Sequence, residues 1–320
     1  VGQPIIRGMS GPRVKILKNG MVNRDVSGRG VDHLNDVDLH DIEQIEIIKG
    51  PSSLLYANGT IGGIINVVNN TIAREDFDGQ EVNAGLETQS ANDGDIQEFN
   101  YKNLLGGWLN FSLGYKNTEL GNFDIPDGAV VHEEEDHGDD DHDEHEEEAL
   151  SYVENSDFAS EAKQFGVSRT GEWGYFGMSY ENLESLYGIP FHGDEHGDEH
   201  GDDDHDDEHG DDDHDDDEHG DEHAGERIFS TTDQTSYNLA GLYNINGGLI
   251  NSISYNWRDT EYSLTEAHAE EEGHDDHEEE EHEEHAPTVF TNDATEYGAI
   301  FDLSSDSFTQ KVALNFVDED

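Results

Sequence analysis

The chain has 320 residues, no cysteine and a formal net charge of −63 at pH 7. This charge excludes nucleic acid as a partner, because too few basic residues are present to neutralise phosphates. The absence of cysteine excludes disulfides and thiolate metal sites, and no apolar run approaches the ~18 residues of a transmembrane helix.

The first 75 residues predict a small domain of short strands. Asn19-Gly20 lies between two apolar runs and is a strong signal for a tight hairpin turn. Further along, an alternating strand ends at Gly50-Pro51, and a second apolar strand is expected from Ile64 to Val68.

After residue 80, apolar and polar residues alternate with a period of two, which indicates β-strands. Tyr237 and Leu239, for example, alternate with Ser236 and Asn238. The pattern predicts nine strands, at approximately 81–89, 96–104, 108–118, 161–169, 173–183, 234–245, 248–262, 294–303 and 307–317. A soluble antiparallel sheet with one wet face would also alternate, but the aromatic-rich apolar faces match an outer-membrane barrel as well.

The lengths of the connections favour the membrane barrel. Short turns follow the second, fourth, sixth and eighth strands, whereas three long tracts follow the third, fifth and seventh, at 132–148, 192–226 and 266–285. These acidic His-rich tracts hold 44 of the 78 acidic residues and 17 of the 19 histidines. Blocks of like charge repel themselves and are expected to stay disordered. Because antiparallel strands reverse direction each time, all three tracts are expected at one end, like the long extracellular loops of such barrels.

Nine strands cannot close into a barrel of this kind, because bacterial single-chain barrels have even strand numbers. An open edge would also leave backbone groups unpaired in hydrocarbon. The 320 residues are therefore expected to be a fragment of a longer chain.

Residues 1–75 resemble the plug domain of TonB-dependent outer-membrane receptors. The resemblance rests on Arg7-Gly8-Met9, Ile45 to Pro51, Leu55-Tyr56 and Gly62 to Val67, in that order, while Ala57 stands where the family usually has glycine.

The resemblance implies an all-β chain in the outer membrane of a Gram-negative bacterium. A truncated plug at 1–75 would precede a transmembrane antiparallel β-barrel over 80–320, with about nine of roughly 22 strands present. Partners implied in this way are outer-membrane lipid and the TonB–ExbB–ExbD energy-transducing complex, whose contact segment is expected upstream of Val1.

Within this family the chain is most similar to zinc receptors of the ZnuD type. The similarity rests on IIRGMSGPRVKILKNGM, on Val31-Asp32-His33 and on ENLESLYGIPFH leading into a His-rich loop. In such receptors an Asp-His pair on the outer side of the plug binds zinc, and Asp32 and His33 match that pair. Further barrel ligands would be expected beyond Asp320.

The tract histidines are the other candidate metal ligands, because imidazole and carboxylate both bind Zn²⁺. Their close spacing lets two histidines and a carboxylate converge in a flexible loop, at sites that are weak because the loop must become ordered. These candidates are His132, His137, His142, His145, His192, His196, His200, His205, His209, His214, His219, His223, His268, His274, His277, His282 and His285. Cu²⁺ and Ni²⁺ would bind the same ligands well, so only the resemblance favours zinc.

The sequence therefore predicts a receptor that takes up divalent metal ions, with Zn²⁺ as the transported ligand and no bound cofactor. No catalytic constellation is recognisable, so no enzyme is expected. One alternative is a TonB-dependent receptor for an iron chelate, haem, nickel or copper. Another is a non-transporting surface protein that buffers metal or adheres. The tracts themselves have a simpler alternative, as solvated charged loops in which histidine is incidental.

Overall fold

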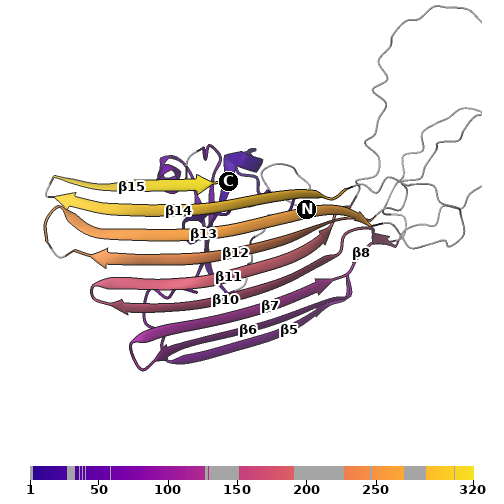
Figure 1. The fold of residues 1–320 in the computed structure, drawn as a ribbon, viewed down its shortest axis with the longest axis horizontal. Coiled ribbons are helices and arrows are strands. Elements are labelled where there is room, and N and C mark those ends of the chain that lie inside the picture. Colours follow the sequence, from indigo (N-terminus) through magenta and orange to yellow (C-terminus); the bar gives the residue numbers. More distant parts are fainter. Residues whose placement is uncertain are drawn as a thin grey trace, which may run out of the picture.

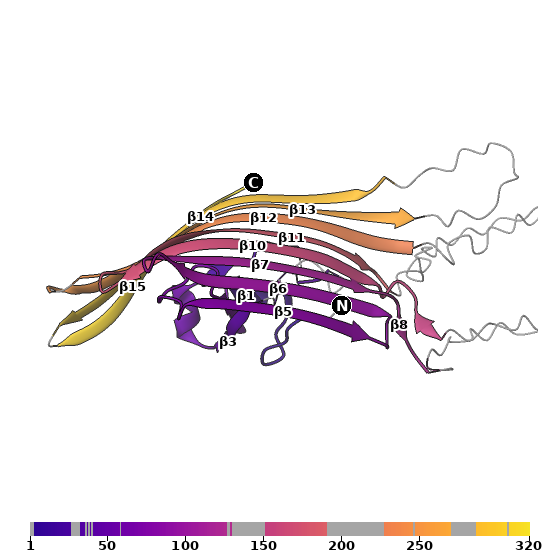
Figure 2. The same cartoon turned by 90° about the horizontal axis from the view of Figure 1, so that it is seen from below.

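The computed structural model of the protein contains a small N-terminal sheet and a curved nine-stranded sheet. Figures 1 and 2 show the N-terminal domain lying against the concave side of the large sheet. The structure describes residues 3–26, 33–35, 37, 39, 41–57, 59–126, 129, 151–190, 227–245, 247–269, 286–305 and 307–320.

The N-terminal domain contains a four-stranded sheet in the order β2-β1-β4-β3. Its elements are η1 (Gly11–Arg13), β1 (Val14–Lys18), β2 (Met21–Val22), β3 (Ile42–Ile48), η2 (Pro51–Leu55) and β4 (Gly63–Asn69). β4 runs parallel to β1 and antiparallel to β3. Among the described residues, no helix combines the length and the apolarity that a membrane crossing requires.

The predicted hairpin turn at Asn19-Gly20 is confirmed. Both residues have positive φ angles, 53° and 84°, as the type I′ turn favoured by Asn-Gly requires. The backbone N–H of Gly20 donates to Oδ1 of Asn66 at 2.8 Å, which ties the turn to β4. The hairpin packs on a small core made by Leu17, Ala57 and Ile64.

The large sheet has the strand order β15-β14-β13-β12-β11-β10-β7-β6-β5, and every neighbouring pair is antiparallel. Its strands are β5 (Gln80–Gln89), β6 (Gly94–Leu105), β7 (Leu109–Leu120), β10 (Phe158–Gly171), β11 (Gly174–Gly188), β12 (Arg227–Asn244), β13 (Ile250–Ala269), β14 (Thr288–Ser305) and β15 (Phe308–Glu319). A separate two-stranded ribbon joins β8 (Phe123–Asp124) to β9 (Tyr152–Val153). The nine predicted strands are thus confirmed in number and order.

Several strands are longer than predicted at the end where the acidic tracts attach. β12 begins at Arg227 instead of residue 234, and β13 continues to Ala269, four residues into the tract predicted as a loop from residue 266. The alternation of apolar and polar residues ends there because the outward positions become polar, as at Thr231 and Asp233. The backbone pairing with the neighbouring strand nevertheless continues. The prediction that 266–269 belong to a loop is therefore wrong.

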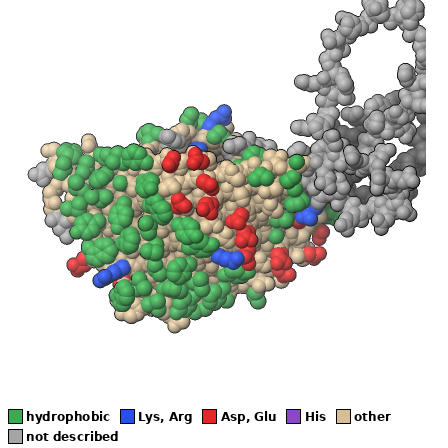
Figure 3. Space-filling view, viewed as in Figure 1, with side chains coloured by type: hydrophobic (Ala, Val, Ile, Leu, Met, Phe, Trp, Pro, Cys, Tyr) green, Lys and Arg blue, Asp and Glu red, His purple; other side chains and the backbone are tan. Residues whose placement is uncertain are grey.

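The outward face of the large sheet has an apolar zone and an acidic row. In Figure 3 hydrophobic side chains cover the part nearer the short turns, and Asp and Glu cross the sheet toward the other end. The row includes Glu161, Glu184 and Asp233, which pair directly across β10, β11 and β12. Because charged side chains on a lipid-facing surface are costly, this row lies beyond the apolar zone that faces hydrocarbon.

The inward face is polar and holds the segment that follows β4. Ser112 and Ser168 donate from their hydroxyls to the carbonyl oxygens of Thr71 and Ala73, each at 2.7 Å. Thr71 in turn donates from its hydroxyl to Oε1 of Gln164 at 2.7 Å. A polar interior is usual for barrels of this kind, and here it fixes the N-terminal domain by hydrogen bonds.

At Gly166 the segment that follows β4 lies directly against the backbone of the sheet. A Cβ atom at Gly166 would overlap the carbonyl oxygen of Thr71. We expect Gly166→Val to lower the free energy of unfolding by about 1–3 kcal/mol, because overpacking forces the backbone apart. Denaturant unfolding followed by tryptophan fluorescence measures this. The control is Gly85→Ala, which meets only the Glu98 side chain and should be neutral; equal losses in both variants would contradict the explanation.

Candidate metal-binding site

His33 is held between the N-terminal domain and the large sheet. The residue is buried, with 6% of its surface exposed. Its ring forms a T-shaped contact with the ring of Phe290 on β14, with the centroids 5.9 Å apart. The next residue, Leu34, donates its backbone N–H to the hydroxyl of Tyr187 on β11 at 3.3 Å. The His33 ring and the backbone next to it therefore contact two different strands of the sheet, β14 and β11.

Glu266 on β13 brings a carboxylate to the same place. Its Oε1 lies 3.2 Å from Nδ1 of His33. Both atoms are buried, and neither has a hydrogen-bond partner of acceptable geometry within the described part of the chain. A buried imidazole nitrogen and a buried carboxylate oxygen that face each other at this distance can share a proton as an ion pair or bind one cation in common.

The spacing of these two atoms fits two ligands of one tetrahedral ion. Zn²⁺ binds imidazole nitrogen and carboxylate oxygen at ~2.0–2.2 Å, so two such ligands in tetrahedral geometry lie about 3.3 Å apart. The distance of 3.2 Å between Nδ1 and Oε1 agrees with this value. His33 and Glu266 together supply two ligands, and no group of three or more His, Asp or Glu side chains is assembled among the described residues.

An apolar cluster closes the site on its inner side. Val26 of the N-terminal domain packs against Tyr262 and Leu264 of β13, with Phe290 beside them. Tyr262 and Leu264 have 2% and 0% of their surface exposed. Apolar side chains therefore adjoin His33 and Glu266 along this part of β13.

Most predicted site residues lie outside the described residues. This holds for Asp32 and for the histidines of the tracts except His268, whose backbone belongs to β13 and pairs with Ile228. Of the predicted ligands, His33 is the one whose side chain the structure describes. Glu266 was not singled out from the sequence. The sequence could have indicated its orientation, because Glu266 is separated from the inward residues Tyr262 and Leu264 by an even number of positions and therefore lies on the same face of the strand.

The N-terminal domain matches the family described as TonB-dependent Receptor Plug Domain over residues 1–64. The N-terminal domain is thus similar in sequence to the plug domains of TonB-dependent receptors. The vitamin B12 transporter BtuB of Vibrio vulnificus (strain CMCP6) is 32% identical over 123 residues, which are 38% of this chain and 19% of that relative.

Solved receptors share the fold of the plug and the strands around it. The copper transporter OprC aligns with a TM-score of 0.63 and 14% identity, over 99% of this chain and 39% of that one. The FrpB iron transporter from Neisseria meningitidis (F3-3 variant) aligns with a TM-score of 0.60 and 13% identity, over 98% of this chain and 42% of that one. The chain thus spans less than half the length of these receptors. Its plug and barrel strands place it in the outer membrane of a Gram-negative bacterium.

Proposed function

We propose that the chain is part of a TonB-dependent receptor that takes up a divalent metal ion, with zinc as the best match. The observation that carries this proposal is the buried pair of His33 Nδ1 and Glu266 Oε1, 3.2 Å apart at the contact between plug and barrel. Asp32 immediately precedes His33 in the chain and would be a third ligand.

The acidic tracts supply ions to this site. The strand ends that flank them, such as Gly188 and Arg227, lie at one end of the sheet because all strands are antiparallel. We assign that end to the outside of the cell. Many weak sites in a strongly negative field raise the local cation concentration above the plug. Rearrangement of the plug, energised through TonB–ExbB–ExbD, then releases the ion into the periplasm.

The ligand chemistry favours borderline divalent ions over other cargoes. The copper transporter and the iron transporter named above have the same fold, so receptors with this fold can transport metals. Soft Cu⁺ prefers thiolate and thioether ligands, whereas the described pair of His33 and Glu266 offers nitrogen and oxygen. Ni²⁺ and Cu²⁺ remain the competing ions. Competitive calorimetry on the whole receptor separates them, and equal affinity for all three ions would refute zinc as the cargo.

Uptake of radioactive zinc by cells that produce the whole receptor tests the proposal. We expect accumulation that disappears in a strain without TonB. Equal accumulation in both strains would favour the alternative, a surface protein that buffers metal without transporting it. The plug domain argues against that alternative, because a passive metal buffer has no use for a plug.

Metal retention by the tracts is expected to depend on pH. An imidazole must be neutral to bind a metal, and unperturbed histidine titrates near pH 6.5. A peptide of residues 192–226 should therefore hold Zn²⁺ at pH 7.5 and release most of it at pH 5, as measured by equilibrium dialysis. A matched peptide with every His replaced by Asn is the control for binding by carboxylates alone. Equal retention by the native peptide at both pH values would show that its histidines are not ligands.

A further inference from the structure

A buried hydroxyl group lies beside the pair of His33 and Glu266. Ser230 of β12 pairs directly with Glu266 of β13 in the sheet register. Residues paired in this way point to the same face of the sheet, with their Cβ atoms about 4.5–5.5 Å apart. Ser230 has 0% of its surface exposed, and its Oγ has no hydrogen-bond partner within the described part of the chain. The hydroxyl is therefore within reach of a ligand that binds to Glu266.

Three buried polar atoms without a hydrogen-bond partner thus gather at this place. Among the described residues there are seven such atoms, and three of them are Nδ1 of His33, Oε1 of Glu266 and Oγ of Ser230, whereas the other four are amide oxygens of asparagines. A buried polar atom without a partner costs free energy, so three neighbouring ones point to a common ligand. A proton shared by His33 and Glu266 would satisfy Nδ1 and Oε1 but would leave the hydroxyl of Ser230 without a partner.

The three atoms differ in the ligand chemistry that suits them. Imidazole nitrogen and carboxylate oxygen are ordinary ligands of Zn²⁺, which usually has four ligands in proteins. A serine hydroxyl is not among these usual ligands, but it both donates and accepts hydrogen bonds. A water molecule bound to the ion would be a suitable partner for Oγ of Ser230, because bridging waters are nearly as favourable as direct hydrogen bonds.

The residues around Ser230 limit the size of a ligand at this place. Tyr187 of β11 pairs directly with Ser230 on the side opposite Glu266, and it is 2% exposed. Its hydroxyl accepts the backbone N–H of Leu34 at 3.3 Å, which ties the plug segment next to His33 to the same row of the sheet. A small hydrated ion can bind among side chains that are so little exposed. A chelate with an organic framework would have to displace the plug segment at Leu34.

We propose that Ser230 is a positioning residue of the site at His33 and Glu266, and that its hydroxyl holds a water molecule carried by the ion. The cargo at this site is a hydrated divalent cation and not a metal enclosed in an organic chelate. Because one ligand of the ion is water, the ion stays exchangeable, as a site on a transport path requires. This inference rests on the proposed function, because it takes His33 and Glu266 to bind the transported ion.

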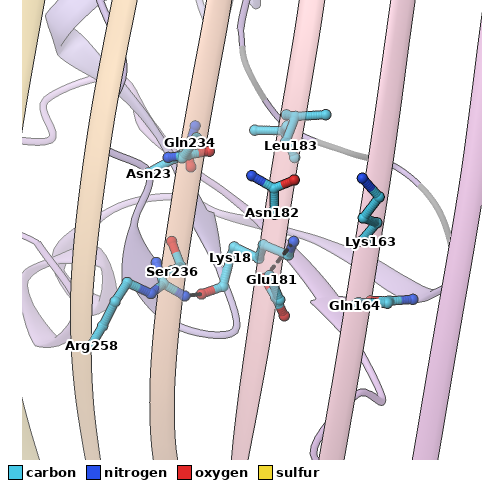
Figure 4. Close-up of a pocket in the computed structure, with 11 residues that line it drawn as sticks. Lys18, Asn23, Lys163, Gln164, Glu181, Asn182, Leu183, Gln234, Ser236 and Arg258 are labelled. Atoms are coloured by element: carbon cyan, nitrogen blue, oxygen red, sulfur yellow. Dashed lines mark hydrogen bonds and ion pairs between the residues drawn. The ribbon is translucent and has the colours of Figure 1, made fainter.

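Ser236 on the same strand provides a matched control for Ser230. It is an even number of positions further along β12, so it points to the same face, and it is 9% exposed. Its Oγ lies 3.2 Å from Oγ1 of Thr260, and the two hydroxyls share a hydrogen bond. Figure 4 shows Ser236 at a separate cavity, which Lys18 and Arg258 also line. The two buried serines thus differ in whether the described part of the chain supplies a partner for the hydroxyl.

Ser230→Ala in the purified whole receptor should lower the affinity for zinc about tenfold, a typical loss for a residue that supports a metal site. Affinity is measured at substoichiometric zinc against a chelator. After removal of metal, Ser230→Ala should resist denaturant at least as well as the wild type, because the substitution removes no hydrogen bond within the described chain. Ser236→Ala should show the opposite pattern, an unchanged affinity for zinc and a lower stability, because Thr260 loses its partner.

The outcomes distinguish this inference from the proposed function. Wild-type affinity in Ser230→Ala, together with a loss of affinity in His33→Ala, would overturn the role of Ser230 and leave the proposed function in place. Equal losses of affinity in Ser230→Ala and Ser236→Ala would also overturn that role, because they would show a general disturbance of the barrel. Haem binding that disappears in Ser230→Ala would overturn the hydrated ion as the cargo of this site. Absence of zinc binding by the wild-type receptor at substoichiometric metal would instead overturn the proposed function.

Discussion

His33→Ala is expected to weaken zinc binding by the whole receptor about 100-fold. Replacing a residue that only supports a metal ligand already lowers metal affinity by up to about 100-fold, and His33 is expected to be a ligand itself. Glu266→Gln should have a similar effect, because the amide keeps the size of the side chain but loses the anionic ligand. If both residues bind one ion, the double variant should bind hardly more weakly than either single variant, since the first substitution already dismantles the site. Binding is measured at substoichiometric zinc against a chelator, so that the weak sites of the tracts stay empty.

Glu261→Gln provides the matched control for this experiment. Glu261 lies on the same strand but is exposed on the outward face. Its replacement removes one carboxylate from the same region of charge without touching the contact with His33. A loss of affinity in Glu261→Gln as large as in Glu266→Gln would mean that general negative charge, and not a defined site, holds the ion.

The fold could be predicted from the sequence wherever apolar residues face lipid. The position of β12 was predicted from alternation, with Tyr237 and Leu239 on one face and Ser236 and Asn238 on the other. Such a period of two arises because one face of the strand contacts lipid and the other faces a polar interior. The outer ends of the strands lack this contrast. Around Asp233 both faces of the strand are polar, so the sequence shows no alternation although the strand pairing continues. For this reason β12 was predicted too short.

The candidate site was only half predictable for a related reason. His33 was identified through the resemblance of Val31-Asp32-His33 to a receptor type, which needs no knowledge of the barrel. Glu266 appears in the sequence as one acid among many in a tract. Its role depends on β13 continuing past residue 262 and on the parity that turns Glu266 inward. Ion pairs such as Lys18 with Glu181 join residues 163 positions apart, and no local pattern reveals them.

Arg258→Met is expected to cause the largest loss of stability, about 3–5 kcal/mol, which is typical when one partner of a buried ionic network is removed. Arg258 is 5% exposed, and its loss leaves the carbonyl of Lys18 and Oδ1 of Asn238 without their donor. It also leaves Glu296, its neighbour in the sheet, with Arg24 as the remaining cation.

The shape of the guanidinium matters as well as its charge. Arg258→Lys should recover only part of the lost stability, because an ammonium cannot reproduce two donors in a fixed fork. Denaturant unfolding of the purified receptor measures the free energy, and protease cleavage within residues 14–26 reports release of the plug. Arg169→Met is the control, since Arg169 is exposed on the outward face over the ring of Trp108 and should change neither quantity much. If Arg258→Met unfolds like the wild type and its plug resists protease equally, the plug is held to the barrel by other contacts, and Arg258 does not determine docking.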